Sequence, residues 1–316
     1  MPPRRLCVLH HRHQEWTPAL QEAEPRLEIR SWHPRDFGAA DQGWLAEAEG
    51  LFAWKLPPGA LARMPVLRWI QCAGAGVDHL LSDPEVSPEV VITRADGRFG
   101  FWMARYVLGH LLEDVQRIRE CREDQAASRW NPKCLPENRG GGKARVVGFG
   151  RIGRQIGRAL REIGMEVTGI VRTPRSDPEF PLRGPSDLPE ALAAARVLVL
   201  AAPSTAQTRG LIGAGVLQHG NPRLTLINVG RGDLVDPSAL IPALEGGRLG
   251  RVVLDVFAEE PLPVGSPLWT HPRVTVTPHH SGPSTPRDLL PDILAKLRAF
   301  AEGRPIPDPV SRQRGY

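Results

Sequence analysis

One stretch, residues 145–157, constrains the fold of this chain more than any other. A short apolar run there meets Gly148, Gly150 and Gly153 in the spacing G-x-G-x-x-G, directly before a helical pattern. In a strand–turn–helix unit the first glycine permits a tight bend, the second lets backbone approach a pyrophosphate, and the third allows close helix–strand packing. Free N–H groups at the helix start would face the phosphates. The pattern predicts a dinucleotide-binding turn, with a βα turn without ligand as the alternative.

The surrounding sequence favours the dinucleotide-binding interpretation. Apolar runs separated by helix-sized segments predict the six strands of a doubly wound sheet, at 146–149, 167–171, 197–201, 224–229, 252–256 and 274–277. Ligands of such a sheet bind at the carboxyl ends of its strands. The second strand ends near the position where a residue that reads the adenosine ribose belongs.

The residues before this sheet predict a smaller α/β domain. Its apolar runs alternate with polar or helical stretches, as in a parallel sheet, and lie at 6–9, 27–29, 51–54, 67–70 and 90–93. This domain lacks a phosphate loop. Residues 101–121 predict one long helix, interpreted as a spacer between domains, and 131–142 predict a loop. A last amphipathic helix is expected after Thr285.

Length and composition agree with a two-domain α/β protein. Of 316 residues, 41% are hydrophobic and 24% charged, and no apolar run approaches the ~20 residues that span a bilayer. We therefore expect no membrane segment. The short apolar stretch before His10 cannot serve as a secretory signal, which indicates a cytoplasmic protein. The formal charge of +5 is scattered along the chain, which suits anionic small molecules better than nucleic acid.

Cysteine and histidine spacing does not favour a metal site. The cysteines, which lack any C-x-x-C pairing and lie in or beside apolar segments, are Cys7, Cys72, Cys121 and Cys134. We interpret them as buried or incidental thiols rather than disulfides or metal ligands. His10, His11 and His13 follow a predicted strand without a clustered carboxylate, so solvated loop histidines are favoured over metal ligands.

Three polar residues that follow predicted strands of the larger sheet stand out, namely Arg231, Glu260 and His279. Taken singly, each has a purely structural alternative. The arginine could bind a helix terminus, the glutamate could be a solvated loop acid, and the histidine could satisfy a backbone carbonyl. Together, at one edge of a nucleotide-binding sheet, they favour catalysis.

These residues lie in motifs that resemble the signatures of the D-isomer-specific 2-hydroxyacid dehydrogenases. The motifs are Asn228-Val-Gly-Arg-Gly232, Leu254-Asp-Val-Phe-Ala-Glu-Glu-Pro-Leu-Pro263 and Thr277-Pro-His279. Further segments extend the likeness over essentially the whole chain, at 54–55, 67–71, 74–79, 266–279 and the terminal 314–316. Within the family, the likeness is greatest to the A-type reductases of glyoxylate and hydroxypyruvate. It implies an α/β fold of two doubly wound domains, a Rossmann NAD(P)-binding domain (103–280) inserted in a flavodoxin-like substrate domain (1–102 and 281–316).

The resemblance implies hydride transfer between a nicotinamide and C2 of a small 2-oxo or 2-hydroxy acid, with a D-2-hydroxy acid as the reduced form. The residue types suit this reaction. His279 can donate a proton to the alkoxide, and Glu260, if bonded to the second ring nitrogen, would fix the tautomer and stabilise the imidazolium. The fork of Arg231 can grip the carboxylate and polarise the carbonyl. His280 and Glu259 are adjacent competitors, and the family motif favours His279 and Glu260.

Further site residues follow from the same resemblance. Backbone N–H groups of Ala75, Gly76 and Val77 are the expected carboxylate anchors from the other domain, so the site would close when both domains meet. Trp54 is expected to wall the substrate pocket, with a core tryptophan as the alternative. Asp255 resembles the residue that holds the nicotinamide carboxamide. The full cofactor-binding set expected is Gly148, Gly150, Arg151, Ile152, Gly153, Arg172, Thr173, Arg175, Pro203, Thr208, Val229, Gly230, Arg231, Asp255 and His279.

The end of the second strand of the larger sheet predicts the choice of cofactor. No Asp or Glu stands at the ribose position, where a carboxylate would accept from a 2′-OH and repel a 2′-phosphate. Arg172, Thr173 and Arg175 instead offer a guanidinium, a hydroxyl and a second cation, a combination suited to a phosphate dianion. We expect NADP(H) to be preferred, with NAD(H) as the alternative, and solvated loop arginines as the structural alternative.

The chain departs from the family pattern at two places, and two other functions stay open. Arg105 stands where relatives usually carry glutamate, and the stretch from Gly140 to Lys143 is one residue short, so the domain contact or subunit interface is in doubt. By family likeness we expect a homodimer. The alternatives to this reductase are a nucleotide-sensing, corepressor-like protein without turnover and an NAD-linked dehydrogenase of another small acid or of phosphite.

Overall fold

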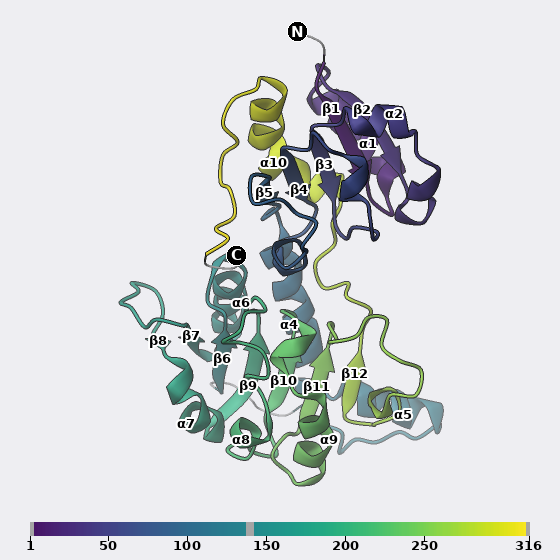
Figure 1. Cartoon of the computed structure of the whole chain (residues 1–316). Helices are drawn as coiled ribbons and strands as arrows, with labels where there is room; N and C mark the ends of the chain where they lie inside the picture. Colours follow the sequence, from purple (N-terminus) through teal and green to yellow (C-terminus); the bar gives the residue numbers. More distant parts are fainter. Residues whose placement is uncertain (1–2, 137–141, 314–316) are drawn as a thin grey trace. The chain divides into compact units, whose positions relative to one another are not determined.

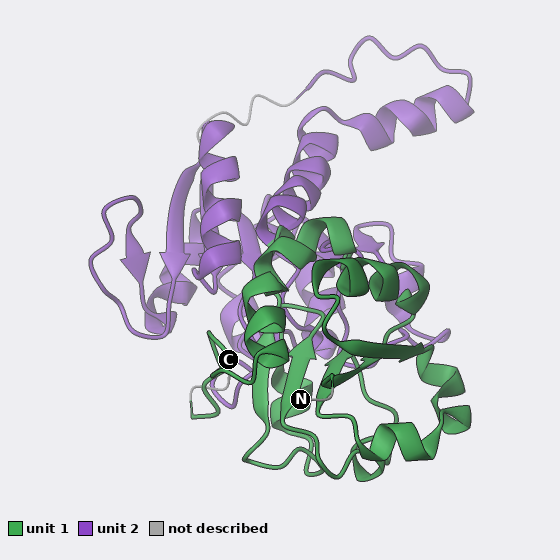
Figure 2. Ribbon diagram, turned by 90° about the horizontal axis from the view of Figure 1, so that it is seen from above, with its two compact units in different colours: residues 1–99, 283–316 green, residues 100–282 purple. Residues whose placement is uncertain are grey.

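The computed structural model describes residues 3–136 and 142–313 and divides into two compact units. Unit 1 comprises residues 1–99 and 283–316, and unit 2 comprises residues 100–282 (Figure 2). Each unit is built around its own parallel sheet. Among the described residues, none of the helices combines the length and the apolar character needed to cross a bilayer.

Unit 1 contains a five-stranded parallel sheet in the order β2-β1-β3-β4-β5 (Figure 1). The strands are β1 Arg5–Leu9, β2 Glu28–Trp32, β3 Gly50–Ala53, β4 Trp69–Cys72 and β5 Val91–Arg94. This is the flavodoxin-like strand order, which confirms the predicted architecture. Its helices are α1 His13–Ala23, α2 Gln42–Ala46, α3 Asp78–Leu81 and α10 Pro286–Ala301, with 3-10 turns η1 Pro34–Ala39 and η2 Leu61–Arg63.

Helix α10 is the C-terminal helix expected from the apolar spacing after Thr285. The Thr285 side chain caps it by accepting from the Asp288 N–H, which satisfies one of the orphan donors of the first turn. The apolar face is buried, and its Phe300 ring lies 4.8 Å from the ring of Trp69 in β4. The helix thus completes the core of unit 1 from a segment remote in sequence.

His10 corrects the prediction of solvated loop histidines. Its side chain is only 1% exposed and stacks on His11, with ring centroids 4.3 Å apart. Its Nδ1 accepts from the Arg12 N–H, so the buried ring bonds the backbone of the turn that follows strand β1. Burial lowers the pKa of His10 to about 3, which keeps the ring neutral. The residues that the structure describes hold no cluster of three or more His, Cys, Asp or Glu suited to a metal ion.

The cysteines occupy two kinds of environment. Cys7 in β1 and Cys72 in β4 are buried, and burial raises the pKa of the Cys7 thiol to about 12. Cys121, in contrast, is exposed, and its Sγ lies 3.5 Å from the Sγ of Cys134. All four are free cysteines, in line with the expectation of buried or incidental thiols, and only the two strand cysteines are buried.

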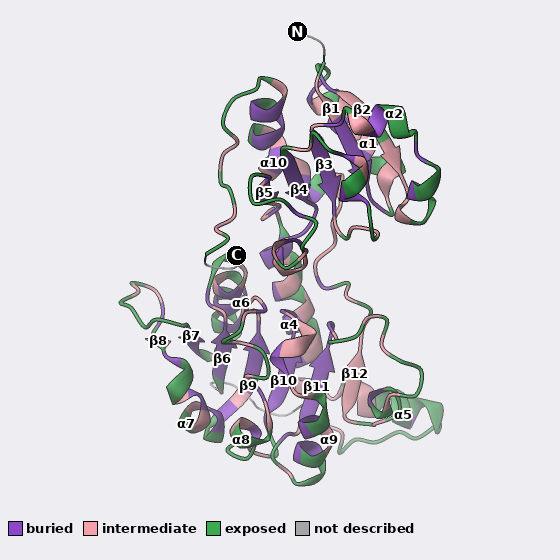
Figure 3. Cartoon of the chain, in the orientation of Figure 1, coloured by how far each residue is buried: buried purple, intermediate pink, exposed green. Residues whose placement is uncertain are grey.

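Unit 2 contains a seven-stranded parallel sheet in the order β12-β11-β10-β9-β6-β7-β8. The strands are β6 Lys143–Val147, β7 Glu166–Ile170, β8 Leu182–Arg183, β9 Ala195–Leu200, β10 Thr225–Asn228, β11 Arg251–Leu254 and β12 Val274–Val276. All six predicted strands are present in the Rossmann order, and β8 and its place beyond β7 were not predicted. The central strands are buried, whereas edge strand β12 is half-buried (Figure 3).

The helices of unit 2 connect these strands as in a doubly wound fold. They are α4 Phe99–Val115, α5 Ile118–Ala126, α6 Arg151–Glu162, α7 Leu188–Ala193, α8 Ala214–Leu217 and α9 Pro237–Glu245. Short 3-10 turns are η3 Pro185–Asp187, η4 Gly232–Leu234 and η5 Pro267–Trp269. Asp236 caps α9 by accepting from the Ser238 N–H, as its position before Pro237 indicates.

The prediction of one continuous helix over 101–121 was wrong. The chain leaves α4 after Val115 and re-enters a helix at Ile118, because Arg117 adopts a left-handed conformation with φ +52°. The spacer interpretation was also wrong, since Val107 and Leu111 of α4 pack into the core of unit 2. The apolar pattern marked the buried face correctly and could not reveal a backbone reversal.

The glycine turn between β6 and α6 depends on close backbone packing. Gly148 has φ +86°, and a Cβ there would lie 2.4 Å from the backbone N of Ala202. A Cβ on Gly153 would lie 2.1 Å from the carbonyl oxygen of Gly148. Gly150, in contrast, has φ −84°, and a Cβ on it would meet nothing within 4 Å. Two of the three glycines therefore serve the fold, and Gly150 borders open space.

This difference predicts opposite effects on stability. Gly148→Ala should lower the free energy of unfolding by at least about 2 kcal/mol, because the new methyl group meets backbone and the left-handed φ is strained. Gly150→Ala is the matched control and should cost less than about 1 kcal/mol. Urea unfolding of both variants measures this, and equal stabilities would contradict the packing described here.

Candidate functional site

The candidate residues of unit 2 follow successive strands at one edge of its sheet. Because all seven strands are parallel, their carboxyl ends share that edge. In spatial order along the sheet, His279 follows β12, Asp255 and Glu260 follow β11, and Arg231 follows β10. Pro203 then follows β9, Gly148 follows β6 and Arg172 follows β7. Residues up to 131 positions apart in sequence, such as Gly148 and His279, thus belong to one row.

His279 and Glu260 are in direct contact. The Nδ1 atom of His279 lies 3.1 Å from both carboxylate oxygens of Glu260, and Oε1 also accepts from the Phe257 N–H at 3.2 Å. A carboxylate partner makes Nδ1 the protonated nitrogen of a neutral imidazole, which leaves the lone pair on Nε2. The side chains are 33% and 23% exposed, so solvent and small molecules can reach the pair.

The backbone that carries His279 is held by Asp255. Asp255 is fully buried, and its carboxylate accepts from the Thr277 hydroxyl at 2.6 Å and from the N–H groups of His280 and Ser281 at 3.0 and 2.9 Å. Its carbonyl oxygen accepts from the His279 N–H at 2.8 Å. His279 has φ +52°, a conformation that non-glycine residues rarely adopt without such support. Asp255 therefore fixes the position of the histidine through its backbone.

Tyr106 of α4 extends this network, and the sequence did not indicate it. Its hydroxyl lies 2.7 Å from the hydroxyl oxygen of Thr277, and since Thr277 donates to Asp255, Tyr106 donates to Thr277. Burial raises the pKa of Tyr106, so it stays protonated as this donor role requires. Burial and then Arg251 lower the pKa of His110, whose ring lies 4.6 Å from that of Tyr106.

Arg231 lies in a tightly built turn after β10, and its guanidinium donates to the Gly230 carbonyl at 2.9 Å. The Asn228 side chain donates to the Arg231 carbonyl at 2.8 Å and accepts from the Gly230 N–H at 3.1 Å. A Cβ on Gly232 would lie 1.9 Å from the carbonyl carbon of Phe257, so this turn packs on the loop that leads to Glu260. The sequence N-V-G-R-G thus supplies the Asn228 amide, which bonds the backbone of the turn, and Gly232, which permits close packing of the turn on the loop that leads to Glu260.

The residues at the other end of the row fit a dinucleotide. Open space in front of Gly150, beside the N-terminus of α6, leaves backbone accessible to a pyrophosphate. Arg151 is exposed at the start of α6, whereas Ile152 is half-buried. Thr208 donates to the Pro203 carbonyl at 2.7 Å and thereby closes the turn after β9. Buried Val229 and Gly230 border the turn after β10, and the residues after β7, namely Arg172, Thr173 and Arg175, are all exposed.

The substrate candidates of unit 1 follow β3 and β4. Trp54 is half-buried, and its ring covers Gly74, where a Cβ would lie 1.8 Å from Cζ3 of the tryptophan. The carbonyl oxygen of Trp54 is 2.5 Å from Nε2 of His79, and the ring centroids of the two residues are 5.1 Å apart. Ala75, Gly76 and Val77 connect Gly74 to α3, so the expected anchors adjoin the tryptophan within this unit. Trp54 also packs against the core of unit 1, as the alternative interpretation of this residue expected.

The two departures from the family pattern have different outcomes. Arg105 on α4 is exposed, and its guanidinium carbon lies 3.4 Å from the centroid of the Phe101 ring, so it stacks on its own helix. The stretch 140–143 lies partly outside the described residues, and the terminal 314–316 motif lies wholly outside them. Strand β6 begins at Lys143 and pairs fully with β7.

Comparison with known proteins shows the family of this chain. The family model for the D-isomer specific 2-hydroxyacid dehydrogenase, NAD binding domain, matches residues 108–281. Glyoxylate/hydroxypyruvate reductase A of Klebsiella pneumoniae (strain 342) is 31% identical over 309 residues, covering 95% of this chain and 96% of that protein. The protein of the same name from Yersinia enterocolitica is 29% identical over 310 residues, covering 96% of each.

Solved structures extend the likeness to three dimensions. A D-isomer specific 2-hydroxyacid dehydrogenase from Xanthobacter autotrophicus Py2, in complex with NADPH and MES, superposes with a TM-score of 0.86 at 34% identity, covering 98% of this chain and 99% of that one. An NADPH-dependent glyoxylate/hydroxypyruvate reductase from Sinorhizobium meliloti, in complex with NADP and sulfate, gives a TM-score of 0.86 at 27% identity, covering 99% and 100%.

The Asp255 network predicts a stability effect that is independent of activity. Asp255→Asn places an NH2 group against a hydroxyl and N–H donors, so the free energy of unfolding should fall by about 1–3 kcal/mol. Exposed Glu259 provides the control, and Glu259→Gln should change it by less than about 0.5 kcal/mol. Urea denaturation tests both variants. An Asp255→Asn protein as stable as the unmodified chain would contradict the bonding described for the buried carboxylate.

Proposed function

Since the chain belongs to the D-isomer-specific 2-hydroxyacid dehydrogenase family, we propose that it reduces a small 2-oxo acid of the glyoxylate and hydroxypyruvate type to the D-2-hydroxy acid with NADPH. The observation that carries this proposal is the contact of His279 Nδ1 with the Glu260 carboxylate, at 3.1 Å, at the same edge of the sheet as a glycine turn suited to a dinucleotide. A family fold alone would not require an oriented, accessible proton donor.

The proton chemistry follows from that contact. The bound nicotinamide supplies the hydride to the carbonyl carbon. In its doubly protonated form His279 donates from Nε2 to the oxygen of the reduced carbonyl, and Glu260 stabilises the positive charge that the ring carries before the transfer. After the transfer, Nδ1 remains bonded to Glu260, so the ring keeps its orientation and can take a proton back in the reverse direction.

The carboxylate of the substrate needs separate recognition. We assign this to Arg231, whose planar guanidinium can bond a carboxylate with two parallel donors and also polarise the carbonyl oxygen. Backbone N–H groups of Ala75, Gly76 and Val77 would supply further donors, and Trp54 would limit the size of the side chain at C3. The Asn228 side chain bonds the backbone on both sides of the Arg231 turn, which supports a fixed backbone position for Arg231.

The cofactor is proposed to be NADP(H), with NAD(H) as a weaker alternative. Arg172, Thr173 and Arg175 are exposed directly after β7, where the Rossmann fold places the adenosine ribose, and no carboxylate ends that strand. Relatives from Xanthobacter and Sinorhizobium were crystallised with NADPH and NADP, which supports the same choice here. Asp255, which the family likeness assigns to the nicotinamide carboxamide, is fully buried, so we assign it the role of holding the His279 segment.

We also propose that the protein is a homodimer. Several large apolar side chains on and after helices α4 and α5 are exposed, with Leu112 at 41%, Ile118 at 39% and Trp130 at 94%. Exposed large apolar side chains of this kind support a surface that a second copy covers.

The role of His279 is tested by its amide analogue. His279→Gln keeps the size and some hydrogen bonding but removes the proton donor, so kcat for reduction should fall by about 100-fold or more while NADPH affinity is retained. His280→Gln alters the neighbouring ring and should keep near-normal turnover. Initial rates with NADPH and a panel of small 2-oxo acids, with cofactor binding by fluorescence, measure both. Near-normal turnover in His279→Gln would refute the assignment.

Cofactor choice is tested by charge reversal. The unmodified enzyme should favour NADPH over NADH by at least about tenfold in kcat/KM, which is ~1.4 kcal/mol, because the arginines bind the 2′-phosphate. Arg172→Asp should shrink or reverse this ratio. Arg223→Asp changes net charge equally but lies before β10, at the opposite end of the strands, and should leave the ratio unchanged. Equal use of both cofactors by the unmodified enzyme would contradict the proposed preference.

A further inference from the structure

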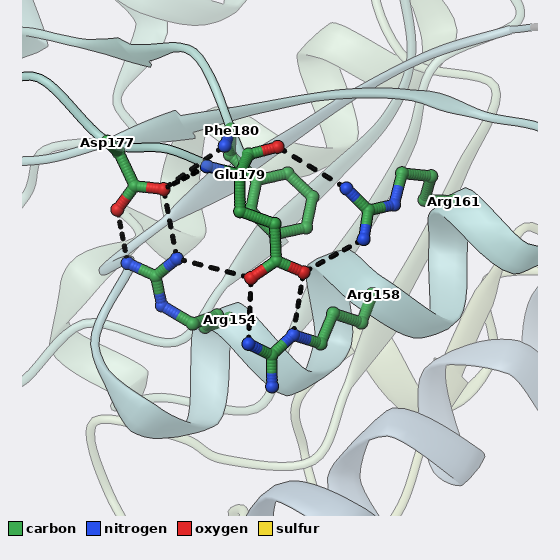
Figure 4. A network of polar contacts seen from close by, with 6 residues as sticks. All are labelled: Arg154, Arg158, Arg161, Asp177, Glu179 and Phe180. Carbon is green, nitrogen blue, oxygen red and sulfur yellow. Dashed lines mark hydrogen bonds and ion pairs between the residues drawn. The ribbon is translucent and has the colours of Figure 1, made fainter.

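We propose that Arg154 of α6 determines the choice of a 2′-phosphorylated cofactor by neutralising acidic side chains in the loop between β7 and β8. The inference rests on the proposed function, and it concerns side chains to which the sequence motifs assigned no role. It follows from a network of three helix arginines and two loop carboxylates (Figure 4).

Arg154 binds Asp177 in a fork. Its two terminal nitrogens lie 3.0 and 2.5 Å from the two carboxylate oxygens of Asp177, which itself accepts from the N–H groups of Glu179 and Phe180 at 3.1 Å each. The Asp177 side chain is only 6% exposed. Within the described parts of the chain, Arg154 is its sole ion-pair partner. Removing this arginine would therefore leave an enclosed carboxylate without a counter-charge.

Glu179 is neutralised more than once. Arg158 bonds both of its carboxylate oxygens at 2.8 and 2.7 Å, and Arg161 bonds Oε1 at 2.8 Å. Arg154 lies 3.6 Å from the same carboxylate. Loss of Arg158 alone would leave Glu179 paired with Arg161, so the three arginines of α6 are not equivalent.

The network adjoins the glycine turn of the proposed cofactor site. The guanidinium carbon of Arg154 is 5.5 Å from the ring centroid of Phe149, which lies between Gly148 and Gly150 of the glycine turn. The Phe149 ring in turn contacts buried Phe180 edge-on at 5.0 Å. The acidic loop is therefore packed against the turn that would hold the pyrophosphate.

Charge decides what this loop can bind. Residues 172–181 carry two cations, Arg172 and Arg175, and two anions, Asp177 and Glu179, so the loop by itself has no net charge. A carboxylate in the loop after the second strand repels a 2′-phosphate and suits a 2′-hydroxyl. The arginines of α6 cancel both carboxylates, and the guanidinium groups of the loop then present an uncompensated positive charge. Arg154 acts as a positioning and masking residue that does not itself contact the phosphate.

Steady-state kinetics with both cofactors tests this. Arg154→Met should raise KM for NADPH by about tenfold while kcat and KM for NADH change by less than about twofold, because only the 2′-phosphate senses the unmasked carboxylate. Arg158→Met is the matched control on the same helix and should leave both KM values near normal. Arg154→Lys, which keeps the cation, should retain most of the preference and serves if the methionine variant folds poorly.

A double variant separates masking from structural support. Arg154→Met combined with Asp177→Asn removes both charges, so KM for NADPH should return to within about twofold of the unmodified value if repulsion is the cause. A double variant as weak as Arg154→Met, or equal rises in KM for the two cofactors, would overturn the inference. An unmodified enzyme without NADPH preference would instead refute the proposed cofactor and this inference with it.

Discussion

The parallel register of the sheet in unit 2 is the constraint on which its candidate site depends. Paired residues run across six strands in one row, namely Val276, Leu254, Asn228, Leu200, Val147 and Ile170. Arg231 and His279 each come three residues after their member of this row, and Gly148 comes one residue after its own. A slip of one residue in any strand would invert its buried face and shift one functional group along the edge. The hydrophobic pattern of the strands thereby also sets where polar chemistry can occur.

Close backbone contacts connect the loops along this edge. Side chains on Gly148 and Gly230 would each meet the backbone of Ala202, at 2.4 and 2.8 Å, and one on Gly232 would meet Phe257. These glycines therefore join the turns after β6, β9, β10 and β11 into one continuous layer. Glycine is required here for contact between backbones, whereas Gly150 leaves space for a ligand. A single motif of three glycines combines both uses, which explains why its spacing is informative about folding and binding together.

The sequence predicted what depends on local pattern and missed what depends on tertiary contact. Strand positions and the glycine turn follow from apolar periodicity and fixed spacing, and the strand order agrees with the family fold. The break at Arg117 was missed because the apolar face continues across it and an arginine rarely has φ above zero. The burial of His10 was missed because it arises from packing against two residues that do not adjoin it in sequence. Trp16 follows after a turn, and Phe52 is remote in sequence. Tyr106 carried no signal, because its partner Thr277 lies 171 residues away.

Two acidic residues support His279 by different physical means. Glu260 contacts the ring and can respond to its charge, whereas Asp255 contacts only the backbone and hydroxyl groups around it and holds a left-handed residue in place. Because the buried carboxylate accepts from two N–H groups and a hydroxyl of the segment, it keeps that segment fixed whichever protonation state the ring has. A proton donor must change its charge in each cycle without moving. Separation of ring orientation from backbone placement meets this requirement, since the group that feels the proton is not the group that sets the position.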